Sequence, residues 1–166
     1  MPGDLLAPLF TKQMRHCTNI TGIGFSHLAA LSCLLRLDIT GCKSNTGSGA
    51  ATICALASLH ELTAYMCVGI ADAGLAVISR LGELRKLYLS GINAITDVWL
   101  EGVAALTHLE QLSSSDCPNI TDAGMSHLVG LKHLRSLCLM NCIKIKVCSV
   151  NYSHSVIFPK NGRKKI

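Results

Sequence analysis

Aromatic and charged residues are both scarce in this chain of 166 residues. Only 4% of the residues are aromatic and 15% are charged, and the net charge is a modest +5. A nucleic-acid interface needs a basic stripe with aromatic side chains that stack on the bases. The few Phe, Tyr and Trp residues are scattered, and none is expected to pair with another. We therefore expect no nucleic-acid partner.

Long apolar runs are missing as well. No uninterrupted apolar run approaches the roughly 18 residues that are needed to span a bilayer. The N-terminal MPGDLLAPLF has an acidic residue and no basic stretch before a short apolar patch, which makes it a poor signal peptide. We expect no membrane contact and an intracellular location, the cytoplasm first and the nucleus as the alternative.

What the chain does have is a 25-residue repeat. Leucines recur at this spacing without insertion or deletion at Leu9, Leu34, Leu59, Leu84, Leu109 and Leu134. The columns that follow them by three, five, eight and eleven residues are mostly apolar too. A period of about 20–29 residues with leucine at fixed offsets is typical of a leucine-rich repeat solenoid.

Each unit has two halves with different periodicities. The segment 84–89 (LRKLYL) ends in inward–outward alternation, which predicts a short strand with one buried face. The segment 97–106 (DVWLEGVAAL) places apolar residues three apart, which predicts a helical or 3₁₀ segment. The predicted fold class is α/β: a right-handed leucine-rich repeat solenoid, a horseshoe arc of about six units with a parallel concave sheet and short convex helices.

Some positions carry expectations of their own. Asp72, Asp97 and Asp122 fall where the N-caps of helices are expected. Trp99 replaces the glycine that other units have at this position, and its indole is expected to lie partly outside. Ser114 replaces an inward leucine and predicts a weak point in the fifth strand.

The unit L-x-x-L-x-L-x-x-C-x-x-I-T-D-x-G-L resembles the cysteine-containing subclass of leucine-rich repeats. It is seen in LKHLRSLCLMNCIKI (131–145), CPNITDAGM (117–125) and IADAGL (70–75), and the likeness covers about residues 6–145. That subclass includes the substrate-recognition arms of F-box ubiquitin-ligase adaptors, and similar arrays occur in trypanosome leucine-rich repeat proteins. The resemblance implies a curved solenoid, but no single function, because such arrays serve many partners.

Five of the nine cysteines share one repeat column: Cys17, Cys42, Cys67, Cys117 and Cys142. Each is expected to point inward as a small apolar filler whose thiol is a weak donor to nearby carbonyls. The odd total and the lack of a C-x-x-C pair argue against a disulfide framework and against zinc. We expect free thiols in a reducing compartment.

No catalytic constellation can be identified. The histidine pairs His27 and His127, and His108 and His133, are separated by whole repeats, which places their rings at unit edges. A catalytic or metal site needs groups that converge. The stretch GSGAAT (47–52) lacks the G-K-[ST] ending of a phosphate loop. We expect no enzyme, no catalytic residue, no metal, no cofactor and no small-molecule ligand.

The candidate functional surface is the concave sheet, where charges of both signs surround tyrosines. Tyrosine and arginine often dominate interfaces, and mixed charge favours a protein or peptide partner over a polyanion. The alternative is that these positions are only the solvated side of a sheet. The candidate partner-binding residues are Arg36, Asp38, Glu61, Tyr65, Arg85, Lys86, Tyr88, Glu110, Gln111 and Arg135.

We divide the chain into a repeat array, residues 1–145, and a divergent basic tail, residues 146–166. The tail is a disordered or non-native terminus, or else a divergent cap with Val147, Val150, Val156, Ile157 and Phe158 as its apolar face. The predicted function is a non-catalytic protein–protein interaction module. The alternatives are the recognition arm of a ubiquitin-ligase adaptor that lacks its recruiting domain, and a truncated or nonfunctional fragment of a repeat gene.

Overall fold

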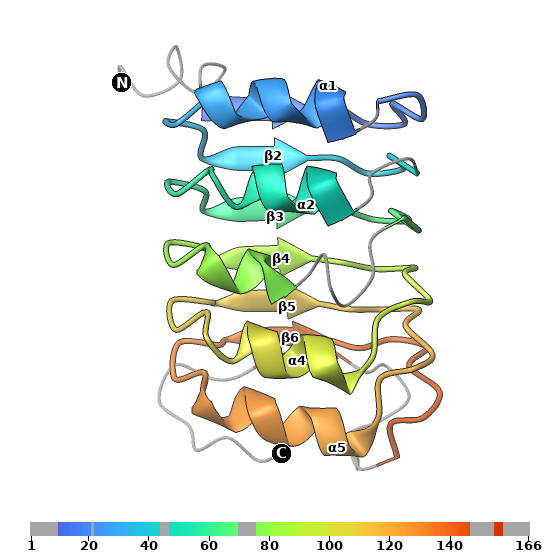
Figure 1. Cartoon of the computed structure of the whole chain (residues 1–166). Helices are drawn as coiled ribbons and strands as arrows, with labels where there is room; N and C mark the ends of the chain where they lie inside the picture. Colours follow the sequence, from blue (N-terminus) through green and yellow to red (C-terminus); the bar gives the residue numbers. More distant parts are fainter. Residues whose placement is uncertain (1–9, 21, 44–46, 70–75, 147–154, 158–166) are drawn as a thin grey trace.

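The structure, a computed structural model, describes residues 10–20, 22–43, 47–69, 76–146 and 155–157. Successive units each add one short strand to a single sheet, in the order β1-β2-β3-β4-β5-β6-β7 (Figure 1). The strands are β1 (Thr11–Gln13), β2 (Arg36–Asp38), β3 (Glu61–Thr63), β4 (Lys86–Tyr88), β5 (Gln111–Ser113), β6 (Ser136–Cys138) and β7 (Ser155–Ile157). The helical segments, with η for 3₁₀, are α1 (Gly22–Ser26), η2 (His27–Ala30), α2 (Gly47–Ile53), η3 (Ile78–Arg80), α4 (Asp97–Val103), α5 (Asp122–Met125) and η4 (Ser126–Gly130).

The 25-residue period is the register of the sheet. Strands β1 to β6 pair in parallel, and each residue lies opposite the one 25 positions later, as Leu62 does with Leu87. The amide of Arg85 donates to the carbonyl of His60 at 2.9 Å, and equivalent bonds recur in the neighbouring units. This topology confirms the predicted α/β leucine-rich repeat solenoid.

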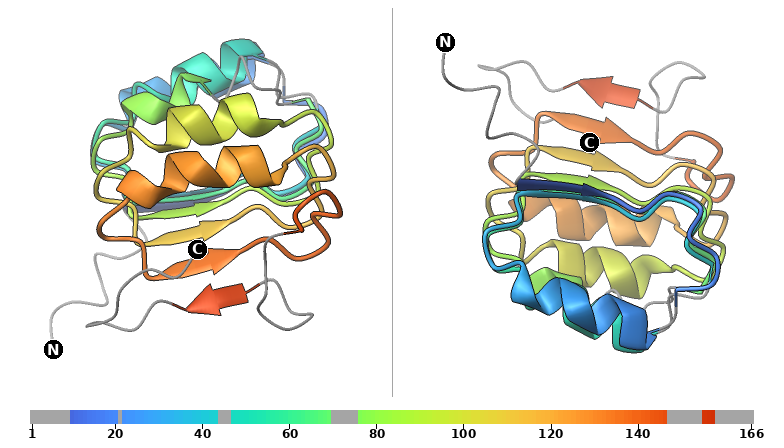
Figure 2. Two further views of the ribbon diagram at one scale, coloured as in Figure 1. Left: turned by 90° about the horizontal axis from the view of Figure 1, so that it is seen from below. Right: turned by 90° about the horizontal axis from the view of Figure 1, so that it is seen from above.

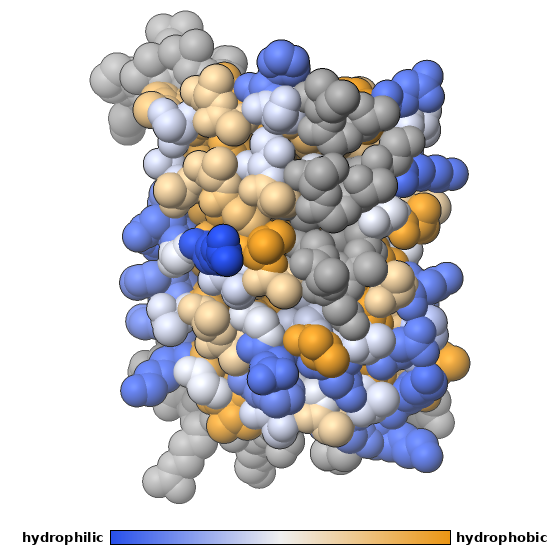
Figure 3. All heavy atoms as spheres, in the orientation of Figure 1, coloured by the Kyte–Doolittle hydropathy of each residue, from blue (hydrophilic) through white to orange (hydrophobic). Residues whose placement is uncertain are grey.

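The helical segments cover one face of the sheet (Figure 2). The opposite face, which none of the described helices covers, is called here the open sheet face. Views along the stack show the helices on one side of the strands only. The helix-covered side is apolar over part of its surface and hydrophilic along its left and right edges (Figure 3). Within the described part of the chain, no helix is long and apolar enough to cross a bilayer.

The core lies between the sheet and the helices and is continuous from unit to unit. The leucine columns predicted to point inward are buried, as Leu62, Leu87 and Leu112 show. One unit alone cannot bury its apolar side, so stacking is what excludes water from each leucine. The first unit is the exception in this column, because Lys12 lies opposite Leu37 and is exposed.

Two expectations about single residues meet different outcomes. Trp99 is only 1% exposed, so the prediction that its indole lies partly outside is wrong. The reason is that α4 buries Trp99 together with Leu100 and Val103, which gives this helix a wider apolar stripe than the repeat pattern indicates. Ser114 is fully buried, and its hydroxyl has no hydrogen-bond partner among the described residues.

Threonines, not aspartates, cap the helices. Thr96 and Thr121 are the N-caps of α4 and α5, and each side-chain oxygen accepts from the backbone amide two residues later. The predicted capping role of Asp97 and Asp122 is therefore wrong, since both occupy the first helical position. Asp72 lies outside the described residues.

The aspartates instead join neighbouring units. The Asp97 carboxylate accepts hydrogen bonds from the backbone amide of Thr121 at 2.8 Å and from its hydroxyl at 2.6 Å. Asp122 repeats the pattern by accepting from the amide of Lys146 at 2.9 Å. A Cβ atom at position 124 would collide with the Asp97 carboxylate, which explains the glycine of the T-D-x-G motif at that point.

The cysteine column forms a second connection between units. The thiols of Cys42, Cys67 and Cys142 donate to carbonyls 28 residues earlier at 2.9–3.0 Å, and Cys117 does so at 3.7 Å. These four side chains are buried, as predicted, whereas Cys17 of the first unit is only partly buried and its thiol donates to the carbonyl of Arg15 at 3.7 Å. The described cysteines are free thiols. Burial raises the pKa of the Cys67 and Cys142 thiols to about 11.

The third residue after each of the strands β1 to β6 adopts a left-handed backbone conformation. Its φ values fall between 55° and 73° at His16, Gly41, Met66, Gly91, Asp116 and Asn141. The position turns the chain out of the strand in every unit. Only two of these residues are glycines, so the remaining units accept the cost of a side chain there.

The sheet ends in a strand of opposite direction. β7 pairs antiparallel with β6, with Leu137 opposite Val156. Most of the predicted tail, residues 147–154 and 158–166, lies outside the described residues, and the boundary at residue 145 remains a prediction.

The aspartate link between units can be tested by mutation. Asp97→Ala removes the acceptor of two hydrogen bonds from Thr121, and bonds to a charged group are worth about 2 kcal/mol. We expect urea-induced unfolding to show a loss of about that size in free energy. Glu101→Ala, an exposed change on the same helix, serves as the control; an equal loss in both variants would contradict the assigned role.

Thiol labelling tests the cysteine column. The thiolate is the reactive form, so buried thiols with raised pKa values should react slowly. We expect a maleimide reagent to modify exposed Cys33 within minutes at about pH 7.5, while Cys42, Cys67, Cys117 and Cys142 react only after urea is added. Peptide mass spectrometry identifies the labelled sites. Rapid labelling of the buried column in native buffer would be incompatible with the packing described.

Candidate protein-binding surface

The open sheet face is built from two registered rows of strand residues. The first residues of the strands form one row, in which Arg36, Glu61, Lys86 and Gln111 follow one another. The third residues form the second row, with Asp38, Thr63, Tyr88 and Ser113. Leucines between the rows point to the core, so the alternation of the strand places both rows on the same side.

The remaining candidate residues flank these rows. Arg85, Glu110 and Arg135 directly precede β4, β5 and β6, and Tyr65 lies just beyond the end of β3. The structure therefore places all ten candidate residues along the strands of one sheet. Their role in binding a partner remains a prediction.

Two tyrosines form an aromatic pair near the middle of the face. The ring centroids of Tyr65 and Tyr88 are 6.4 Å apart, with the planes tilted by 53°. The expectation that no aromatic residues pair is thus wrong, because the sheet register brings together side chains that are 23 residues apart. The Tyr88 hydroxyl donates to Oε1 of Gln111 at 2.6 Å, which fixes the direction of its ring. Burial raises the pKa of both tyrosines, so both are neutral at physiological pH.

Charged side chains pair across neighbouring strands. Glu61 lies between two cations, with Arg36 at 3.7 Å on one side and Lys86 at 3.8 Å on the other. Arg85 and Glu110 are 3.3 Å apart. Because these pairs are partly exposed, they contribute little to stability and mainly determine which groups face solvent.

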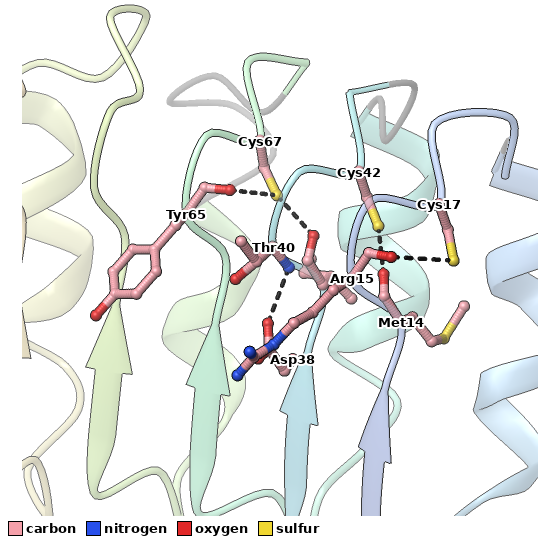
Figure 4. A network of polar contacts seen from close by, with 9 residues as sticks. Met14, Arg15, Cys17, Asp38, Thr40, Cys42, Tyr65 and Cys67 are labelled. Carbon is pink, nitrogen blue, oxygen red and sulfur yellow. Dashed lines mark hydrogen bonds and ion pairs between the residues drawn. The ribbon is translucent and has the colours of Figure 1, made fainter.

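A tighter network lies at the N-terminal end of the face (Figure 4). The Asp38 carboxylate accepts from the backbone amide of Thr40 at 3.0 Å and from Nε of Arg15 at 2.5 Å. Burial alone would raise the pKa of Asp38, but the hydrogen bonds from Thr40 and Arg15 and the charge of Arg15 lower it below its usual value. Arg15 was not among the predicted site residues; its place in the repeat column of Tyr65 is the signal that could have identified it.

Hydroxyl groups form a further set of contacts beside the tyrosines. Ser90 and Ser113 are linked through their hydroxyls at 3.3 Å, and the amide of Ser115 donates to Ser90 at 3.3 Å. Ser115 in turn contacts the Cys138 thiol at 3.3 Å. Among these small side chains, the large exposed or half-buried groups are Tyr65, Tyr88, Met66 and Met140.

Nothing in the described ranges resembles a metal centre. No group of three or more His, Cys, Asp or Glu side chains among those residues could hold an ion. His108 and His133 stack with their centroids 6.2 Å apart. They lie in successive turns before the strands, as the repeat spacing predicts.

Comparison with known proteins supports the fold. No protein-family model matches the chain, and no curated protein is similar to it in sequence. Among solved structures, internalin C2 from Listeria monocytogenes superposes with a TM-score of 0.59 at 24% identity, covering 83% of this chain and 54% of the internalin. A complex of Rad7 and Elc1 from yeast gives a TM-score of 0.35 at 16% identity over 81% of this chain and 57% of that one, too low to support an argument.

These findings, together with the strand register, define the class of protein: the chain folds as a leucine-rich repeat solenoid. It spans little more than half the length of the two structures it matches. At this level of identity the likeness concerns the fold alone.

The lowered pKa of Asp38 makes stability depend on pH. A carboxyl group whose folded pKa is lowered stabilises the native state above its unfolded pKa of about 3.9, and this contribution is lost as the pH falls through the folded value. We expect Asp38→Asn to reduce the free energy of unfolding at neutral pH and to flatten its decline below about pH 4. Urea titrations over that range, with Glu101→Gln as the control, measure the effect. An unchanged acid dependence in Asp38→Asn would contradict it.

Proposed function

We propose that the chain is a non-catalytic interaction module that binds a protein or peptide partner on the open sheet face. The observation that carries this proposal is the Tyr65–Tyr88 pair, which lies among charged side chains on a face that no described helix covers. Tyrosine supplies a large contact area at a low entropic cost, and arginine adds hydrogen bonds. Both residue types are concentrated here.

The exposure of neighbouring side chains supports the same surface. Tyr65 is 37% exposed and Met66, directly after it, is 57% exposed. Apolar groups of this size beside a polar rim are typical of an interface centre. The central anchors of the proposed site are Tyr65, Tyr88, Arg85 and Lys86, and the other candidate residues surround them.

The proposal also includes the repeat subclass and the cellular compartment that the sequence predicts. The thiol-to-carbonyl bonds between units support membership of the cysteine-containing subclass, and free buried thiols are compatible with a reducing, intracellular compartment. The role of a ubiquitin-ligase recognition arm remains a hypothesis from the sequence resemblance alone. A nonfunctional fragment predicts a molten product, so cooperative thermal unfolding of the full chain would argue against it.

A binding experiment tests the surface assignment. Peptides are selected from a random phage-displayed library on the immobilised full chain, and their affinity is then measured by calorimetry. We expect Tyr88→Ala combined with Lys86→Glu to lower the affinity for the selected peptides tenfold or more, which corresponds to about 1.4 kcal/mol, because both changes remove central contacts. The thermal midpoint should change little, since neither side chain is in the core.

The matched control places the same kinds of change on the helix-covered side. Val98 is 63% exposed in α4, and Arg80 is exposed at the end of η3. Val98→Ala combined with Arg80→Glu should leave the affinity within a factor of two. If the selected peptides bound the sheet variant as tightly as the unchanged chain, the assignment of the open sheet face would be wrong.

A further inference from the structure

The ion-paired carboxylates of the open sheet face are less exposed than their cations. Glu61 and Glu110 have side-chain exposures of 28% and 29%, and that of Asp38 is 12%. Their partners are more exposed: Lys86 at 40%, Arg85 at 48%, Arg15 at 59% and Arg36 at 62%. In each of these four ion pairs the cationic side chain is the more exposed partner, so an approaching molecule has more access to it than to the carboxylate.

The open sheet face also carries more cationic side chains than carboxylates. Five cationic side chains, Arg15, Arg36, Arg85, Lys86 and Arg135, share this face with four carboxylates, Asp38, Glu61, Glu110 and the exposed Asp116 in the repeat column of Met66. Glu61 serves two cations at once, at 3.7 and 3.8 Å, so neither is fully neutralised. The face thus carries charges of both signs, and the cations are the more exposed groups of its ion pairs.

At β4 the cations and the aromatic pair lie at different ends of the strand, whereas Arg15 lies at the aromatic end, in the repeat column of Tyr65. Arg85 directly precedes β4, Lys86 is its first residue, and Tyr88 is its last residue, with Tyr65 beside it. Three residues of extended chain separate Arg85 from Tyr88, which corresponds to roughly 10 Å. A ligand that meets both must carry its negative charge and its apolar group about that far apart.

We propose that the partner is an acidic peptide segment with an apolar or aromatic anchor residue, its carboxylates on Arg85 and Lys86 and its anchor on Tyr65 and Tyr88. This inference rests on the proposed function and specifies the partner's chemistry. The tilted and hydrogen-bonded tyrosines offer no parallel platform for successive bases of a nucleic acid.

Defined probes test this inference on the full chain. Three fluorescent peptides share one length and one central Phe, and the flanking residues are Asp and Glu in the first, Ser and Gln in the second, and Lys and Arg in the third. We expect the acidic peptide to bind at least tenfold more tightly than the neutral one, the basic peptide to bind most weakly, and the acidic affinity to fall with added salt.

Charge reversal on the face supplies the decisive variant. Arg85→Glu combined with Lys86→Glu should lower the affinity of the chain for the acidic peptide at least tenfold and raise its affinity for the basic peptide. The control, Arg80→Glu combined with Lys132→Glu, makes the same change in net charge at exposed positions in η3 and in the turn before β6. It should alter either affinity by less than twofold.

Three results would overturn the inference: the acidic peptide binding no more tightly than the basic one, both variants weakening it equally, or oligothymidine binding more tightly than the acidic peptide. Tyr65→Ala combined with Tyr88→Ala separates this failure from that of the proposed function. If a neutral or basic peptide binds best and the tyrosine variant abolishes its binding, the open sheet face binds peptides and only the acidic preference is wrong. If no peptide responds to the tyrosine variant, both proposals fail.

Discussion

Backbone hydrogen bonds between units at a constant sequence offset are the constraint on which the rest of the structure depends. The amides of His60, Arg85 and Glu110 each donate to the carbonyl 25 residues earlier, and those of Ile39, Ala64 and Leu89 to the carbonyl 24 residues later. A slip of one residue in a strand would send its leucine to solvent and its charge into the core. An insertion within a strand would therefore disrupt the register, and this chain has none between its leucine columns.

Once the register is set, the other columns acquire their contacts. Buried thiols reach carbonyls of the preceding unit, and Asp97 reaches the cap of the following helix. The left-handed position ends each strand at the same place. These contacts hold neighbouring units in fixed positions, and the outward rows of the sheet inherit that order. The result is a surface with the Tyr65–Tyr88 pair near its centre and with cationic side chains that are more exposed than their carboxylate partners.

The repeat made much of this predictable. Period, strand and helix halves, inward leucines and inward cysteines all follow from residue columns, because equivalent positions have equivalent surroundings. The sequence failed where the surroundings are specific to one unit. Trp99 is buried because α4 packs it into the core together with Leu100 and Val103. Asp97 is the first residue of α4, directly after the N-cap Thr96. The Tyr65–Tyr88 contact and the inner position of Glu61 depend on side-chain directions across strands, which no column reveals.

Amide hydrogen exchange on the chain alone tests the central claim most directly. If one register organises the array, slow exchange must recur every 25 residues, at Ile39, Ala64 and Leu89 and again at His60, Arg85 and Glu110. Assigned spectra in deuterated buffer report each site. That recurrence would establish the ladder that presents the open sheet face. Protection without a 25-residue recurrence, or uniformly fast exchange, would contradict the solenoid and with it the surface proposed to bind a partner.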